Sequence, residues 1–150
     1  MKLLKMPSGI QQCLLYSLAM LLDEEVDDLI QELGHNGMVR TFDQLIPYCY
    51  NGHHIQEIID VFLRRGIFIT PIELYPRYAS ARAPTDFRML WPEEEAQKRF
   101  WSTIKGQRGL LLSNTHACAW DGAIVWDPIG RTYGIEEFNV RECWIIDITS

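Results

Sequence analysis

Several features that mark other protein classes are missing from this sequence. No apolar run approaches the 18 residues that a membrane-spanning helix needs, and the opening Met1–Met6 is too short for the hydrophobic region of a signal peptide. Only 14 basic side chains stand against 20 acidic ones, for a net charge of -6, which disfavours a protein that coats phosphate backbones. We therefore expect a cytoplasmic protein, in a host cell or its virus, that binds neither nucleic acid nor membrane.

The cysteines form no metal-binding or disulfide pattern. The four are Cys13, Cys49, Cys118 and Cys143, and no CxxC pair occurs. The nearest set of zinc-ligand types is Cys49 with His53 and His54, but adjacent histidines seldom reach one metal together and no fourth ligand is suitably spaced. Cytosolic thiols stay reduced, so we expect free cysteines, no bound metal and no cofactor.

The hydrophobic pattern divides the chain into a helical part and a strand part. At 150 residues, 47% apolar and 23% charged, the sequence suits one domain over 1–150. Apolar spacing, glycine stops and a proline start predict a helix at 14–22, a second that opens in the acidic cluster 23–28 and stops at Gly34, a third between Asn51-Gly52 and Gly66 with its apolar stripe at 55–63, and a fourth at 92–105. Strands are predicted at 67–72 (broken by Pro71), 109–113, 115–120, 123–127, near 132 and at 142–148. Helices followed by a meander make an α+β domain, with an irregular loop from Glu73 to Trp91.

Cys13 is the cysteine best placed for chemistry. It falls at or just before the first turn of the predicted apolar helix that ends at Leu22. At that position the helix dipole and the unpaired backbone N–H groups favour a thiolate and can bind a developing oxyanion. A buried structural cysteine is the alternative, because cysteines are commonly buried.

His116 and Asp127 flank a predicted hairpin turn, Asp121-Gly122. If this pair makes a two-residue turn, residues whose numbers add to 243 face each other, and His116 then faces Asp127 directly. The carboxylate would orient the imidazole while the other ring nitrogen points at a thiol. The same register puts Cys118 on the face of His116, where we expect it to pack rather than react.

Two glutamines precede the nucleophile candidate. The side-chain amide of Gln11 or of Gln12 could donate to an oxyanion, as could the backbone N–H of Cys13. Gln12 is the weaker choice if the chain is already entering the helix. The sequence does not determine which of these groups donates to the oxyanion.

Two motifs resemble a known family. The segment Gln12–Leu22 looks like the nucleophile helix of papain-like peptidases that process bacteriocin leader peptides, and His116–Gly122 followed by Trp126–Gly130 is similar to their His strand and Asp-Pro turn. The resemblance is confined to these motifs at the two ends of the chain and extends to uncharacterised phage and bacterial proteins. It implies a papain-like fold with the nucleophile helix on the sheet. The family usually has Asp before the cysteine and Gly after it, where this chain has Gln12 and Leu14.

Three functions follow from these residues. The first is a thiol hydrolase that cleaves a peptide, isopeptide or amide bond of a peptide or protein substrate, with Cys13 as nucleophile, His116 as acid and base, and Asp127 orienting His116. The second is a catalytically silent papain-like binding or inhibitor protein of phage or mobile-element origin. The third is an acyltransferase or deamidase with the same triad, since water or an amine can resolve one thioester. The sequence does not define the oligomeric state.

Overall fold

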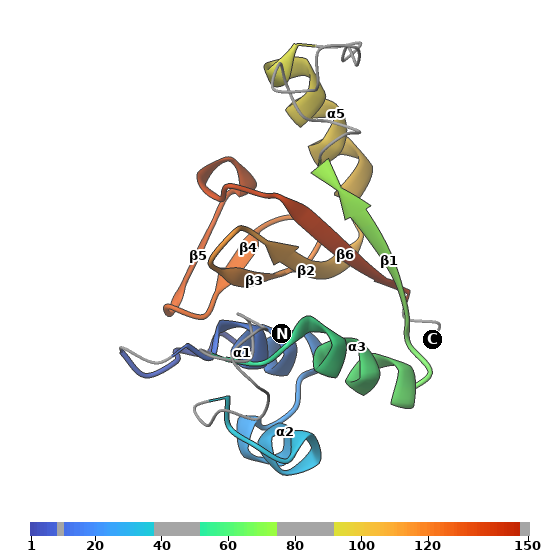
Figure 1. Ribbon diagram of the computed structural model, residues 1–150. Helices are drawn as coiled ribbons and strands as arrows, with labels where there is room; N and C mark the ends of the chain where they lie inside the picture. The colour runs from blue at the N-terminus through green and yellow to red at the C-terminus, as the bar shows by residue number, and fades with distance from the viewer. Residues whose placement is uncertain (9–10, 38–51, 75–91, 148–150) are drawn as a thin grey trace.

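The computed structural model describes residues 1–8, 11–37, 52–74 and 92–147. In these ranges the chain is an α+β domain with four α-helices, one short 3-10 helix and six strands (Figure 1). The helices are α1 (Cys13–Leu22), α2 (Val26–Leu33), α3 (Ile55–Arg64), α5 (Glu93–Ile104) and the 3-10 helix η2 (Ile135–Glu137). The strands are β1 (Phe68–Glu73), β2 (Arg108–Leu112), β3 (Ala117–Trp120), β4 (Val125–Asp127), β5 (Arg131–Tyr133) and β6 (Glu142–Asp147).

The strands form one antiparallel sheet in the order β1-β6-β2-β3-β4-β5. Helices α1, α2 and α3 gather on one side of the sheet, and α5 lies on the other (Figure 1). Alternate residues of the central strands enter two separate cores: Leu110 and Ala119 pack with α1, whereas Leu111 and Cys118 pack with α5. No helix in the described part of the chain is long and apolar enough to cross a lipid bilayer.

Helix α1 is central and buried, as its sequence predicts. Its side chains Leu15, Leu18 and Leu21 are almost completely buried, and burial of each stabilises the fold by about 1.5–3 kcal/mol. The helix contacts β2, β3 and β4 on one side and α2 and α3 on the other. This packing fixes the position and direction of the helix that begins at Cys13.

Strand β1 corrects one prediction. The sequence predicts a strand broken by Pro71, but β1 runs through Pro71, which pairs with Trp144 of β6. The sheet order places β1 at an edge, where a residue without a backbone N–H is tolerated. The interruption is therefore wrong, and the strand itself is confirmed. The irregular loop predicted from Glu73 to Trp91 lies, from residue 75 onward, outside the part of the chain that the structure describes.

The β3–β4 hairpin corrects a second prediction. The strands pair Trp120 with Val125, so the four residues between them form the turn, and the predicted two-residue turn is wrong. The Asp121 carboxylate accepts hydrogen bonds from the backbone N–H groups of Ala123 at 2.7 Å and Ile124 at 2.8 Å, which closes the longer turn. The register differs from the predicted one by two residues. Because two residues are one strand repeat, the side chains keep their predicted faces.

Candidate active site

Cys13 is held against the start of β3 by its own helix. It is the first residue of α1, and Ser17 lies on the same helix face four residues later. The Ser17 hydroxyl donates a buried hydrogen bond of 3.1 Å to the carbonyl of Ala117. Since His116 directly precedes Ala117, this bond fixes the Cys13 face of the helix beside His116. Ser17 was not anticipated from the sequence, although its four-residue spacing from Cys13 was visible there.

The chain before α1 runs beside the Asp-Pro turn after β4. Lys5 forms an isolated antiparallel bridge with Ile129, and the Met6 N–H donates to the Pro128 carbonyl at 2.7 Å. Pro128 follows Asp127. The same turn that carries the candidate orienting carboxylate therefore also holds the segment that leads to Cys13.

His116 bridges the thiol and the carboxylate. Its Nε2 lies 2.8 Å from Asp127 Oδ1, and its ring also interacts with the Cys13 side chain, which lines the same pocket. With Nε2 directed at Asp127, the thiol is left with the other ring nitrogen, Nδ1. The hydrogen bond with Cys13 does most to raise the pKa of His116, burial opposes it, and Asp127 adds to the increase, giving a pKa of about 9.

The contact between His116 and Asp127 confirms the prediction, but its geometry differs. Continued from Trp120 and Val125, the observed register puts Cys118 directly opposite Asp127, so His116 is a diagonal neighbour. Long side chains reach across such a diagonal. The Ser113 hydroxyl accepts a hydrogen bond of 3.0 Å from the His116 backbone N–H, which fixes His116 directly before the first residue of β3.

Asp127 accepts hydrogen bonds from three donors. Besides His116, these are the Ile129 backbone N–H at 3.0 Å and the Tyr133 hydroxyl at 2.5 Å. Burial alone would raise the pKa of Asp127, but these hydrogen bonds outweigh it and hold the pKa below its ordinary value. The carboxylate thus stays ionised beside His116. The sequence predicts a strand near Thr132 but gives no sign that Tyr133 reaches Asp127.

Cys118 lies behind the His116–Asp127 pair. Its side chain is completely buried, and Sγ lies 3.7 Å from the Tyr133 hydroxyl. Burial raises the pKa of Cys118 well above that of an ordinary thiol, and the negative charge of Asp127 raises it further. A thiol in this position stays protonated at neutral pH, which disfavours it as a nucleophile.

The two glutamines before Cys13 differ in their surroundings. Gln12 is the buried N-cap residue of α1, and its Nε2 donates to the Asn36 carbonyl at 2.6 Å. Gln11 is exposed and lines the pocket next to Cys13. The first helical hydrogen bond runs from the Tyr16 N–H to the Gln12 carbonyl. The N–H groups at the start of the helix, including that of Cys13, therefore have no acceptor within it. The geometry favours Gln11 and this N–H as oxyanion donors.

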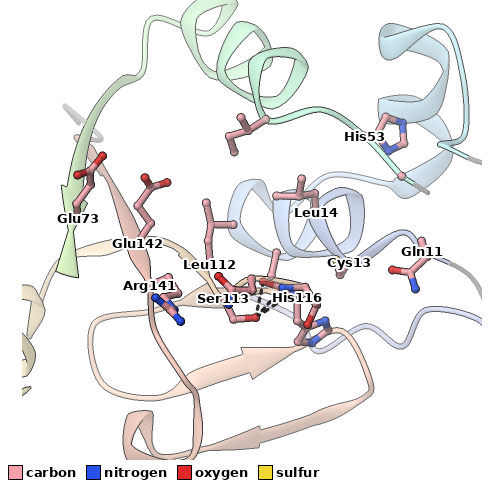
Figure 2. Close-up of a pocket in the computed structure, with 15 residues that line it drawn as sticks. Gln11, Cys13, Leu14, His53, Glu73, Leu112, Ser113, His116, Arg141 and Glu142 are labelled. Carbon is pink, nitrogen blue, oxygen red and sulfur yellow. Dashed lines mark hydrogen bonds between the residues drawn. The ribbon is translucent and has the colours of Figure 1, made fainter. Parts of the chain in front are cut away.

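Cys13 and His116 open onto a pocket of about 600 Å³. Figure 2 shows Cys13, His116 and Gln11 on one side of it, with Glu73 and Glu142 from the neighbouring strands β1 and β6 on the other. The rest of the lining consists of Leu14, Gly52, His53, Ile55, Leu112, Ser113, Asn114, Thr115, Ala117 and Arg141. This volume lies within the range of about 300–1,000 Å³ that is usual for ligand pockets.

A second histidine cluster lies beyond the N-terminus of α1. His53 Nε2 donates to the His35 carbonyl at 3.0 Å, and the two rings stack with their centroids 4.4 Å apart. His35 also bonds Glu57, whose other oxygen accepts the His54 backbone N–H at 2.8 Å. These contacts support the turn whose Asn36 carbonyl holds Gln12. The predicted exclusion of a zinc site at Cys49, His53 and His54 is not tested, since Cys49 lies outside the described residues.

Comparison with models of protein families, with curated proteins and with solved structures finds no match to this chain. The likeness to papain-like peptidases therefore depends on the motifs around Cys13, His116 and Asp127. The geometry of these three residues and of the pocket beside them is the ground for the catalytic activity proposed below.

Proposed function

We propose that this chain is a papain-like thiol hydrolase that cleaves a peptide, isopeptide or side-chain amide bond. The observation that carries the proposal is that His116 interacts with the Cys13 side chain and, through Nε2, with the Asp127 carboxylate. Nucleophilic catalysis by a thiol requires this order of nucleophile, base and orienting acid. The arrangement joins residues from α1, the start of β3 and the end of β4.

In the proposed mechanism, Cys13 and His116 act as a thiolate–imidazolium pair. The Cys13 thiolate attacks the carbonyl carbon of the substrate, and the carbonyl oxygen becomes the oxyanion. His116 Nδ1 gives its proton to the leaving amine as the carbon–nitrogen bond breaks, which leaves a thioester on Cys13. Water then attacks the thioester with His116 as base, and the carboxylic acid product leaves the regenerated thiolate. Asp127 keeps the imidazole oriented throughout.

The N-terminus of α1 supplies the electrostatic part of this mechanism. The backbone N–H of Cys13 and the partial positive charge of the helix N-terminus stabilise the oxyanion, with the exposed amide of Gln11 as a second donor. Gln12 acts differently, since its bond to Asn36 fixes the start of the helix. One oxyanion donor contributes about 2.7–4 kcal/mol to transition-state stabilisation in well-studied hydrolases.

The same site would serve an acyltransferase or a silent binding protein less directly. The open pocket beside Cys13 leaves room for an amine acceptor as well as for water, so acyl transfer shares every step up to the thioester. A catalytically silent binding protein does not require an imidazole with a raised pKa beside a thiol. It also does not require a buried carboxylate that is held ionised by three hydrogen-bond donors, as Asp127 is. Both features therefore favour an active enzyme.

The test is acylation by p-nitrophenyl acetate, a small activated ester that needs no recognition of the leaving group. Attack by the Cys13 thiolate releases p-nitrophenolate and leaves an acetyl thioester, which water hydrolyses. We expect mass spectrometry of digested protein to find the acetyl group on Cys13, removable by hydroxylamine. The Cys13→Ala variant should release p-nitrophenolate no faster than buffer does.

The matched control is Cys143→Ala, because Cys143 is a buried cysteine of β6 that takes no part in the site. It should be acetylated at Cys13 at the rate of the parent protein. Acetylation shared among several cysteines, or equal rates in the parent and in His116→Ala, would contradict the proposed hydrolase. A thioester resolved faster by added glycinamide than by water would identify an acyltransferase.

A further inference from the structure

The candidate site contains three side chains that could bind a metal ion together, and the hydrolase mechanism does not use one of them, Cys118. His116, Cys118 and Asp127 each present a ligand atom, and these atoms all lie within 4.8 Å of one another. Two of the three side chains, Cys118 and Asp127, are buried. The sequence did not suggest this set, because the predicted register paired His116 with Asp127 and left Cys118 farther along the strand.

The chemistry of these three groups suits zinc. Imidazole nitrogen, thiolate sulfur and carboxylate oxygen are its usual protein ligands, at about 2.0–2.3 Å from the ion. Ligand atoms around a tetrahedral ion are then about 3–4 Å apart, so the cluster needs only small side-chain movements. Three protein ligands leave the fourth position to water, and the His116 side chain, 26% exposed at the pocket, gives access to solvent.

The surroundings of the cluster also favour a bound cation. The Tyr133 hydroxyl donates to Asp127 Oδ2 and the Ile129 backbone N–H donates to Oδ1, so both hydrogen bonds orient the carboxylate while Oδ1 faces His116. Without metal, an imidazolium balances the Asp127 carboxylate. With zinc, two negative ligands balance two positive charges, and two protons leave, one from His116 Nε2 and one from the Cys118 thiol. The buried cluster is neutral in both states, which limits the cost of exchange.

We propose that His116, Cys118 and Asp127 form a zinc site that reversibly inactivates the Cys13–His116 pair. Zinc on Nε2 breaks the bond between His116 and Asp127 and occupies the nitrogen that the carboxylate orients. The imidazole can then carry no more than one proton, on Nδ1, so it cannot form the imidazolium that pairs with the thiolate. Inactivation rests on the proposed hydrolase function, whereas zinc binding does not.

The test uses the Cys13→Ala variant, which removes the competing thiol and keeps the three proposed ligands. After treatment with EDTA and removal of the chelator, cobalt(II) is added as a spectroscopic substitute for zinc. We expect one cobalt ion per chain, a thiolate-to-cobalt charge-transfer band and loss of the band when zinc is added. Cys13→Ala/Cys118→Ala should lose the band and bind zinc at least about tenfold more weakly, whereas Cys13→Ala/Cys143→Ala should behave as Cys13→Ala does.

Several results would overturn the zinc site. Absence of the charge-transfer band in Cys13→Ala refutes it without any further variant, provided that circular dichroism shows a folded protein. A band that persists in Cys13→Ala/Cys118→Ala would place the metal on another thiol. A protein that binds zinc at Cys118 but shows no acylation at Cys13 would refute the hydrolase and leave the metal site standing.

Discussion

Two histidines that line the pocket beside Cys13, His116 and His53, have opposite properties. His116 is partly exposed, lies between a thiol and a carboxylate, and has a pKa raised to about 9. His53 is almost completely buried and packs against another histidine, and burial lowers its pKa. One environment favours the imidazolium and the other favours neutral imidazole.

The difference shows that charged partners, rather than burial alone, determine the direction in which the pKa of a histidine shifts. Burial opposes the imidazolium in both residues, but His116 contacts two groups that can carry negative charge, whereas His53 donates to a neutral carbonyl. The Nδ1 of His53 is buried and has no hydrogen-bond partner among the residues that the structure describes, and Gly37 lies so close that a Cβ there would be 2.8 Å from this atom. We interpret His53 as a packing and support residue for the turn behind α1.

The largest expected effect comes from breaking the reactive cluster at its centre. His116→Ala removes the base and the proton donor, and we expect the rate of p-nitrophenolate release to fall by about 10²–10⁴-fold. His54→Ala is the matched control, since His54 caps α3 outside the pocket. The control should cost about 1 kcal/mol of stability and keep the rate per folded molecule. An equal loss of the rate of p-nitrophenolate release in the two variants would contradict a special role for His116.

A smaller effect is expected from Asp127→Asn, which keeps the shape of the side chain but removes its charge. The amide can no longer stabilise the imidazolium, so we expect the pKa of His116 to fall and acylation to slow by about 10–10²-fold, less than on removal of the imidazole. NMR titration of the His116 ring in EDTA measures the first effect, and p-nitrophenolate release measures the second. An unchanged titration would show that Asp127 does not act through its charge.

His53→Ala should disturb stability instead of chemistry. Loss of the buried ring and of its bond to the His35 carbonyl should lower the free energy of unfolding by about 2–3 kcal/mol. Urea denaturation measures this loss. The alkylation rate of Cys13 by iodoacetamide at pH 6, corrected for the folded fraction, should change less than about threefold. A change as large as that in His116→Ala would mean that the support cluster tunes the thiol directly.

The sequence predicts the parts of this molecule that depend on local pattern. The run from Leu14 to Leu22 is apolar on most sides, so a buried central helix follows from composition, and Cys13 at its start follows from the boundary. The strands from Arg108 onward follow in the same way. The shared face of His116 and Asp127 is also predictable, because an error of two residues in the register does not change it.

The errors and omissions involve contacts that local pattern does not contain. Asp-Gly favours a two-residue turn, but the Asp121 carboxylate bonds the N–H groups that follow it and stabilises a longer one. Gln12 has its partner in a turn 24 residues away, so the sequence could not separate its role from that of Gln11. The predicted meander places β5 beside β4, but the reach of Tyr133 to Asp127 depends on the register of these strands, which the residue pattern does not specify.

The smallest expected effect is on the pH dependence of the free energy of unfolding, and it sharpens the contrast between the two histidine clusters. The pKa of His116 is raised in the folded protein from an ordinary 6.5 to about 9, so the folded state holds a proton that the unfolded state loses. Its contribution to stability is complete below pH 6.5 and is lost as the pH rises toward 9. We expect the stability difference between the parent and His116→Gln, measured in EDTA, to shrink by on the order of 1–2 kcal/mol across this window. Because the bond with Cys13 contributes most, Cys13→Ala should remove most of the dependence, and a flat difference would contradict the ion pair.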